Sequence, residues 1–134
     1  MSQTIHGVLS GLIICALTVP AAALCADAKP SLEGALAEHG YRAGEAVEQV
    51  PGFRLDDWKA VDSKHLIVHD DAAQAYLVTL EYRCYGLGGS PLTVRTRSPG
   101  VLAARDEFQV KHMGQVADRC AVDTLQRLET APGG

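Results

Sequence analysis

The chain has 134 residues and a formal net charge of −4; 47% of its residues are hydrophobic and 21% are charged. This length is typical of one domain, and this composition is typical of a globular protein rather than a disordered one. The excess of acidic residues argues against nucleic acid as a partner. A protein that binds nucleic acid neutralises its phosphates with a surface rich in lysine and arginine.

Residues 1–28 have the features of a secretory signal peptide, with an apolar run over residues 8–19 that is followed by small residues. Cleavage is expected after Ala26 or Ala28, and a cut after Ala23 is the third candidate. The apolar run is shorter than the about 20 residues that cross a bilayer. We therefore expect a cleaved signal, no stable membrane span in the mature protein, and a location in the periplasm.

The cysteines of the mature chain predict one disulfide. The signal peptide contains Cys15, and with either of the two later cleavage points it also contains Cys25. Cys84 and Cys120 remain, an even pair in an oxidising compartment, and neither lies in the C-x-x-C spacing of redox-active or metal-binding pairs. A bridge between them closes a loop of roughly 37 residues, which contributes about 3–4 kcal/mol to stability in the chain-entropy model.

The mature chain divides into three regions. Residues 29–46 are expected to form an N-terminal arm, in which Ser31 is a candidate N-cap of one short helix. Residues 47–129 are expected to form a β-rich domain, and residues 130–134 a disordered tail. A short first strand is expected at residues 45–50.

Two strongly apolar runs form the centre of the predicted domain. Residues 65–69 and 75–85 alternate in the manner of strands, and an Asp-rich turn joins them. In the first strand, Leu66 and Val68 share one face, and Ile67 lies on the other. In the second strand, the face expected to lie in the core carries Tyr76, Val78, Leu80, Tyr82 and Cys84.

Further strands are expected at residues 92–97 and 107–112. Residues 53–61 alternate less regularly because two adjacent aspartates disturb the register, and Trp58 in this segment is interpreted as a core or edge filler. Residues 120–128 fit either a strand or a helix. Short strands between Gly and Pro turns predict a mainly β fold: a small antiparallel sheet or a partly closed barrel, with a short N-terminal helix or arm.

A pattern of apolar residues, aspartates and the two cysteines covers about residues 53–128. Its members are Trp58, Val61, Asp62, Leu66, Ile67, Val68, Ala75, Tyr76, Leu77, Val78, Leu80, Cys84, Leu87, Asp106, Val110, Cys120, Val122 and Leu125. This pattern resembles a family of small exported proteobacterial proteins catalogued as domain of unknown function 6491. The resemblance favours a strand for residues 120–128, and it implies no activity, substrate or catalytic residue. Residues 101–105 depart from the family pattern, because they lack the glycine that often precedes Asp106.

The histidines raise the possibility of a metal site. His65 and His69 have the H-x-x-x-H spacing that binds zinc on a helix. On a strand the two residues lie about 13 Å apart, at about 3.3 Å per residue, so they cannot ligate one ion. A metal site would have to combine His69 with Asp70 and His112. Solvent-facing or capping histidines are the simpler interpretation, and we expect neither a metal nor a cofactor.

The sequence contains no common motif of a serine hydrolase or of a phosphate-binding loop. No serine lies in G-x-S-x-G or S-x-x-K, and the glycine-rich residues 86–89 are not followed by the G-K-[ST] of a phosphate-binding loop. The pairs Asp56-Asp57 and Asp70-Asp71 point to opposite faces of an extended chain, so neither forms a ready acid–base dyad. We therefore expect a non-catalytic protein, and an enzyme of unrecognised type is a further hypothesis.

A basic and aromatic surface is the remaining candidate site. Arg83, Arg95 and Arg97, with Tyr85 and Tyr82 nearby in the sequence, would form it on one face of the sheet; a solvated face with cross-strand charge pairs is the alternative. The sequence therefore predicts an exported envelope protein that acts as a non-catalytic binding or interaction module, with an envelope protein or a glycan as its partner. The alternative is a periplasmic accessory protein that binds a metal or a small ligand.

Overall fold

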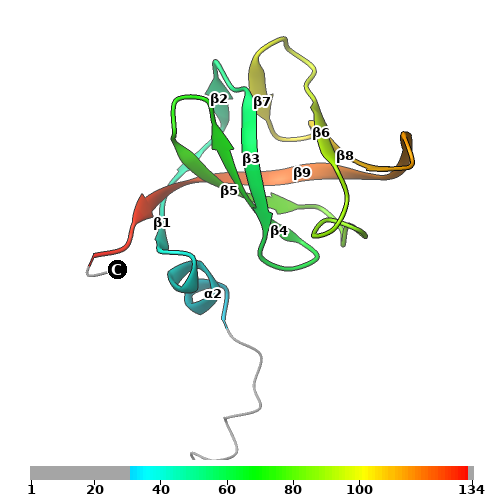
Figure 1. Ribbon diagram of the computed structural model, residues 1–134. Coiled ribbons are helices and arrows are strands. Elements are labelled where there is room, and N and C mark those ends of the chain that lie inside the picture. Colours follow the sequence, from blue (N-terminus) through cyan, green and yellow to red (C-terminus); the bar gives the residue numbers. More distant parts are fainter. Residues whose placement is uncertain (1–30, 133–134) are drawn as a thin grey trace, which may run out of the picture. The chain divides into compact units, whose positions relative to one another are not determined.

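The computed structural model describes residues 31–132, which form a mainly β unit with one short helix (Figure 1). The expected signal peptide, its cleavage points and residues 133–134 lie outside the described residues. In chain order the elements are α2 (Leu32–Glu38), β1 (Tyr41–Val47), β2 (Gln49–Pro51), β3 (Leu55–Ala60), β4 (His65–Asp70), β5 (Ala75–Leu80), β6 (Leu92–Arg95), β7 (Val101–Ala103), β8 (Glu107–His112) and β9 (Gln115–Thr130).

The C-terminal strand β9 organises the sheet. The strands follow the order β3-β4-β5-β9-β8-β6 with antiparallel neighbours, β1 also pairs with β9, and β2 and β7 form a small sheet of their own. β9 is 16 residues long and pairs first with β8, then with β5, and at its end with β1. Figure 1 shows β9 in orange and red crossing the domain, while the other strands curl into a nearly closed barrel. The predicted mainly β fold with a short N-terminal helix is confirmed.

Alternating side chains of the strands fill the barrel. The buried set includes Leu66, Val68, Tyr76, Val78, Leu80, Cys84, Phe108, Val110, Val122 and Leu125. The core face predicted for β5 is therefore confirmed, with one exception, and in β4 the face that carries Leu66 and Val68 lies in the core. Tyr82 is 78% exposed. The prediction that Tyr82 lies in the core was wrong, because β5 ends at Leu80 and the alternation of the strand does not continue to Tyr82.

A second, smaller hydrophobic cluster lies outside the barrel, where helix α2 covers β4 and β5. Leu36 of the helix is fully buried against Ile67 and Leu77, which occupy the outer positions of the two strands. Ser31 caps the helix as expected, because its Oγ accepts a hydrogen bond from the backbone N–H of Gly34 at 3.0 Å. The outer positions of Ile67 and Leu77 are therefore apolar because the helix packs against them.

Residues 120–128 belong to β9, so the strand interpretation is confirmed. Leu125 and Leu128 have a helix-like spacing, yet Leu125 is buried inside the barrel and Leu128 lies in the cluster under α2. Val122 and Leu125 both reach the barrel core because the register between β5 and β9 shifts just after Val122. Such an irregularity changes which face the following residues occupy.

Strand β1 lies within the range expected to form an arm. It pairs with β9 from Tyr41, opposite Thr130, and its register shifts around Gly44. A Cβ at Gly44 would lie 2.9 Å from the carbonyl oxygen of Arg127, so the close approach of the two strands requires glycine. The burial of β1 does not alternate, which is why the sequence indicates a strand only later, at residues 45–50.

Strand β3 contains the irregularity that its adjacent aspartates predict. The pairing of β3 with β4 shifts between Leu55 and Asp57. Beyond this shift, Trp58 is half-buried and packs against the barrel core, as expected of a filler at the edge of a sheet.

Candidate anion-binding site

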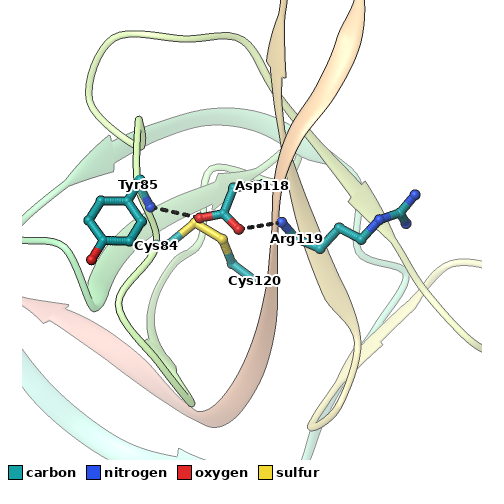
Figure 2. Close-up of a disulfide and its surroundings, with 5 residues drawn as sticks. All are labelled: Cys84, Tyr85, Asp118, Arg119 and Cys120. Atoms are coloured by element: carbon teal, nitrogen blue, oxygen red, sulfur yellow. Dashed lines mark hydrogen bonds between the residues drawn. A yellow bond between two sulfur atoms is a disulfide. The ribbon is translucent and has the colours of Figure 1, made fainter.

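The disulfide between Cys84 and Cys120 joins the segment after β5 to the middle of β9, which confirms the predicted pairing (Figure 2). The two Cα atoms lie 5.7 Å apart, and both cysteines are buried. Asp118 supports the junction: its carboxylate accepts hydrogen bonds from the backbone N–H of Tyr85 at 2.9 Å and of Arg119 at 2.8 Å. This bridge is a buried structural link and carries no exposed thiol.

The structure does not bring together the weak metal candidates His69, Asp70 and His112. Nε2 of His69 lies 2.8 Å from the hydroxyl of Tyr41, Asp70 caps the turn after β4, and His112 is exposed at the end of β8. Within residues 31–132, the one group of three potential ligands whose atoms converge consists of Asp118 and the two cysteines. These cysteines are bonded to each other, so they offer no thiolates to a metal.

The predicted basic and aromatic surface is divided between different places. Tyr85 is 74% exposed and lines a shallow depression with Val110, His112 and Asp118. Figure 2 shows the side chains of Tyr85 and Arg119 on opposite sides of Asp118. Arg83 lies in the exposed segment after β5 and lines neither this depression nor the one that contains the other two predicted arginines.

The other two predicted arginines form part of a larger basic site. An open depression of about 480 Å³ is lined by Arg95, Thr96, Arg97, Arg105, Glu107 and Arg119. We call these six residues the arginine depression. Two of its arginines, Arg105 and Arg119, were not predicted from the sequence. For Arg119 the alternation of β9 was the one available signal, and it is informative only when the pairing of the strands is known; Arg105 lies in the turn before β8, where alternation gives no signal.

Strand pairing accounts for the convergence of these side chains. Arg95 of β6 lies opposite Glu107 of β8, and Gln109 lies opposite Arg119 of β9. Opposite residues of antiparallel strands share a face, and residues two apart on one strand do as well. The neighbouring residue Phe108 is fully buried in the barrel, so the four polar side chains lie on its outer face.

A buried carboxylate fixes the backbone of this site. Asp106 is 2% exposed, and its side chain accepts hydrogen bonds from the backbone N–H of Arg97 at 2.9 Å and of Ala103 at 2.7 Å. Its own carbonyl oxygen accepts a hydrogen bond from the backbone N–H of Val122 at 2.8 Å. Asp106 therefore ties the segment after β6 to β7 and to β9.

Arg105 precedes this aspartate in a strained conformation. Its φ angle is +74°, in the left-handed region that favours glycine. Its backbone N–H donates to the carbonyl oxygen of Val122 at 2.7 Å, so the conformation is held by the sheet. A residue with a Cβ pays about 1–2 kcal/mol for this conformation. Glycine is the residue that adopts this conformation without strain.

Glu107 is the one acidic residue that lines the arginine depression. Its Oε1 accepts hydrogen bonds from Nε2 of Gln109 at 2.8 Å and from Nη1 of Arg119 at 3.1 Å. The hydrogen bond from Gln109 lowers the pKa of Glu107, and the charges of Arg119 and Arg95 lower it further against the opposing effect of burial. Glu107 is therefore ionised at neutral pH, and it pairs with Arg119 alone among the four arginines in the ion pairs of the described residues.

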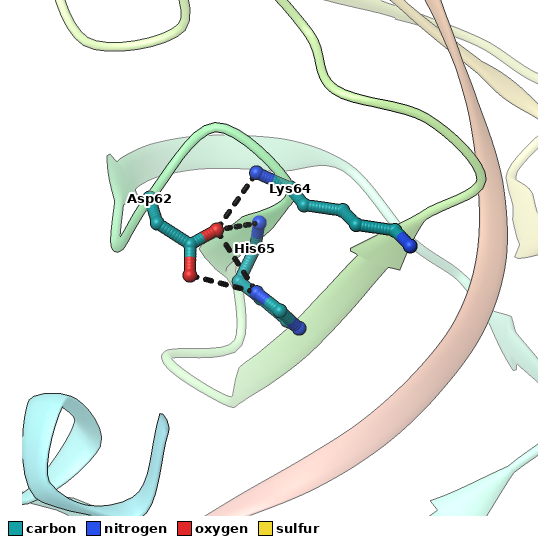
Figure 3. Close-up of polar contacts among 3 residues, drawn as sticks. All are labelled: Asp62, Lys64 and His65. Carbon is teal, nitrogen blue, oxygen red and sulfur yellow. Dashed lines mark hydrogen bonds and ion pairs between the residues drawn. The ribbon is translucent and has the colours of Figure 1, made fainter. Parts of the chain in front are cut away.

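In the turn between β3 and β4, His65, the first histidine of the H-x-x-x-H spacing, contacts Asp62 (Figure 3). Asp62 accepts hydrogen bonds from the backbone N–H groups of Lys64 at 2.7 Å and His65 at 2.8 Å, and its carboxylate lies 2.9 Å from Nδ1 of His65. Burial raises the pKa of Asp62, but these hydrogen bonds and the charge of His65 outweigh it and lower the pKa. His65 therefore stabilises a turn.

Within residues 31–132, the guanidinium groups of Arg95, Arg97 and Arg105 form no ion pair, so they are available in the arginine depression. Guanidinium groups donate forked pairs of hydrogen bonds that match the oxygens of carboxylates and phosphates. The hydroxyl of Thr96 adds another donor to the same site. The arrangement is chemically suited to holding an anion.

Comparisons with other proteins place the chain in one family. No helix within residues 31–132 is long and apolar enough to cross a membrane. No curated protein and no solved structure matches the chain. The model of the family of unknown function DUF6491 matches residues 8–132, which confirms the resemblance noted in the sequence, and the chain belongs to this family.

Proposed function

We propose that this protein is exported to the periplasm and acts there as a non-catalytic module that binds an anionic envelope partner in the arginine depression. One observation carries the proposal: four guanidinium groups and one carboxylate line a single depression on a chain whose net charge is −4. A locally positive site attracts anions, whereas the rest of an acidic protein surface does not.

The open form of the depression supports a partner larger than a small metabolite. Sites for small molecules are concave and bury most of the ligand surface. The arginines Arg95, Arg97, Arg105 and Arg119 are exposed, so they can reach an acidic group that projects from a glycan or from a protein.

Export is supported by two features. Residues 1–28 have the form of a signal peptide, and the disulfide between Cys84 and Cys120 is of a kind that persists in oxidising compartments. Fractionation of cells that produce the full chain, followed by mass measurement of the mature protein, tests this part. We expect a periplasmic protein that begins after Ala26 or Ala28; a cytoplasmic protein of uncleaved mass would contradict export.

The binding role is tested with a charge-removal variant and defined polyanions. We expect the mature protein to bind polygalacturonate, an acidic glycan, or polyglutamate, an acidic polypeptide, more weakly at higher salt. The double variant Arg95→Ala/Arg97→Ala should lower the affinity by about tenfold or more, because each charged hydrogen bond contributes about 1.5–3 kcal/mol.

Arg54→Ala is the matched control. Arg54 is highly exposed, makes a long ion pair of 3.9 Å with Asp71, and does not line the arginine depression. The substitution removes one positive charge from another part of the surface, so binding should remain close to that of the wild type. Equal losses in the double variant and in this control would contradict a specific site.

A further inference from the structure

We propose that the arginine depression recognises a phosphate group with two negative charges, and that Arg105 is held in a strained backbone conformation because its guanidinium completes this site. The inference rests on the proposed function and names the chemistry of the anion. It also assigns a role to a residue that the fold alone would replace by glycine.

The first step concerns the backbone of Arg105. Its φ angle of +74° is imposed from both sides, since its N–H bonds to Val122 and the next residue, Asp106, holds Arg97 and Ala103. Strain of this kind in a conformation fixed by its surroundings points to a role for the side chain. The exposed side chain of Arg105 lines the arginine depression and has no ion-pair partner among the described residues.

The second step concerns the charge of the ligand. Glu107 already pairs with Arg119 at 3.1 Å, which leaves the guanidinium groups of Arg95, Arg97 and Arg105. A single carboxylate carries one charge and two oxygens and would leave most of these donors unused. A phosphate monoester carries about −1.5 to −2 charge at neutral pH and three acceptor oxygens, which matches the three free guanidinium groups better.

The third step concerns how the site holds its shape. Arg97 and Arg105 lie on backbone segments that Asp106 joins, and Arg95 and Arg119 lie on paired strands. The backbone positions of the four arginines are therefore fixed before a ligand arrives. A site organised in this way loses less conformational entropy on binding than a set of arginines on a mobile loop.

The test combines affinity and stability in two variants that both delete the guanidinium. In Arg105→Ala the backbone strain remains, and in Arg105→Gly it is relieved. We expect both variants of the mature protein to bind inorganic pyrophosphate about tenfold or more weakly than the wild type in calorimetric titrations. We expect Arg105→Gly to melt about 4 °C or more above Arg105→Ala, because only glycine adopts this conformation freely.

The outcomes separate this inference from the proposed function. If Arg105→Gly does not melt above Arg105→Ala, the inference that the backbone of Arg105 is strained is wrong, whatever the affinities for the anions are. If both variants keep wild-type affinity for pyrophosphate while Arg95→Ala/Arg97→Ala loses it, the role of Arg105 is wrong and the binding function stands. If the wild type binds polygalacturonate but not pyrophosphate, the ligand class is wrong.

Two further arms identify the source of the phosphate and the limit of the proposal. Vesicles that contain phosphatidic acid, compared with vesicles of phosphatidylcholine, report whether a lipid headgroup is accepted as well as the free anion. Arg54→Ala serves again as the control and should bind pyrophosphate as the wild type does. A wild-type protein that binds no polyanion, no pyrophosphate and no acidic vesicle would overturn the proposed function together with this inference.

Discussion

A single buried carboxylate, that of Asp106, holds the backbone on which the arginine depression is built. It accepts hydrogen bonds from Arg97 and Ala103 with both of its oxygens. A side chain without these acceptors would leave two backbone N–H groups unpaired, at about 1–3 kcal/mol for each buried group. We therefore expect substitution of Asp106 to disturb the backbone of the site as well as the stability of the domain.

The turn at Asp62 makes the stability of the protein depend on pH. The folded state lowers the pKa of Asp62 below the ordinary value of 3.8. Its contribution is therefore fully present above about pH 3.8 and is lost as the pH falls through the lower, folded pKa. We expect Asp62→Ala to lower the free energy of unfolding by about 0.5–1.5 kcal/mol at neutral pH, and the difference from the wild type to shrink in acid.

Urea unfolding of both proteins at neutral pH and below pH 3.8 measures this dependence. Glu48→Ala is the control, because Glu48 is exposed in the short link between β1 and β2. A difference between Asp62→Ala and the wild type that stays constant down to the lowest pH would show that the carboxylate charge is not the cause.

Part of the candidate site could be predicted at the level of residues. Arg95 and Arg97 stand two apart in a short apolar strand, so the sequence indicates that they share a face. Arg105 and Arg119 join them only through the pairing of β8 with β6 and β9, which depends on contacts between distant segments. Tyr85 is near Arg83 in the sequence, but it lines a different depression from Arg95 and Arg97, because proximity along the chain does not determine which surface a side chain joins.

Helix α2 stabilises the domain from outside the barrel. Leu36 is fully buried against Ile67 and Leu77, so Leu36→Ala should lower the free energy of unfolding by about 2–5 kcal/mol. Binding of anions should persist in the folded protein, because the arginine depression lies on other strands. Denaturant unfolding and hydrogen exchange measure the effect, which should be larger than that of Leu32→Ala, since Leu32 is only partly buried. Equal effects of the two substitutions would contradict this packing.

The elements differ in how well the sequence predicts them. β4 and β8 were predicted almost to the residue, because one face of each packs in the core and the other is more polar, apart from Ile67. The burial of Ile67 under α2 was not predicted, since a helix on the outer face leaves no trace in the alternation of a strand. β9 was ambiguous because a register shift and a change of face give its apolar residues the spacing of a helix.

The disulfide acts on the whole molecule, because Cys84 and Cys120 are 36 residues apart and join the loop after β5 to β9. We expect Cys84→Ala/Cys120→Ala to lower the free energy of unfolding by about 3–4 kcal/mol, as the open chain gains entropy when it unfolds. Urea unfolding of the variant and of the wild type measures this difference.

Alkylation followed by intact mass measurement checks the bridge itself. The native mature protein should take up label at these two cysteines only after reduction. Two thiols that are freely labelled in the native periplasmic protein would contradict the disulfide, whereas the double variant provides the unlabelled reference.

The position of β9 also determines the order in which the parts of the domain can fold. Its partners β1, β5 and β8 all precede it in the sequence, and Tyr41 pairs with Thr130 near the other end of the domain. A nascent chain that stops before Gln115 leaves β5 and β8 without the strand that joins them, so the barrel cannot close. The barrel can therefore close only when residues 115–130 are available to pair with β5 and β8.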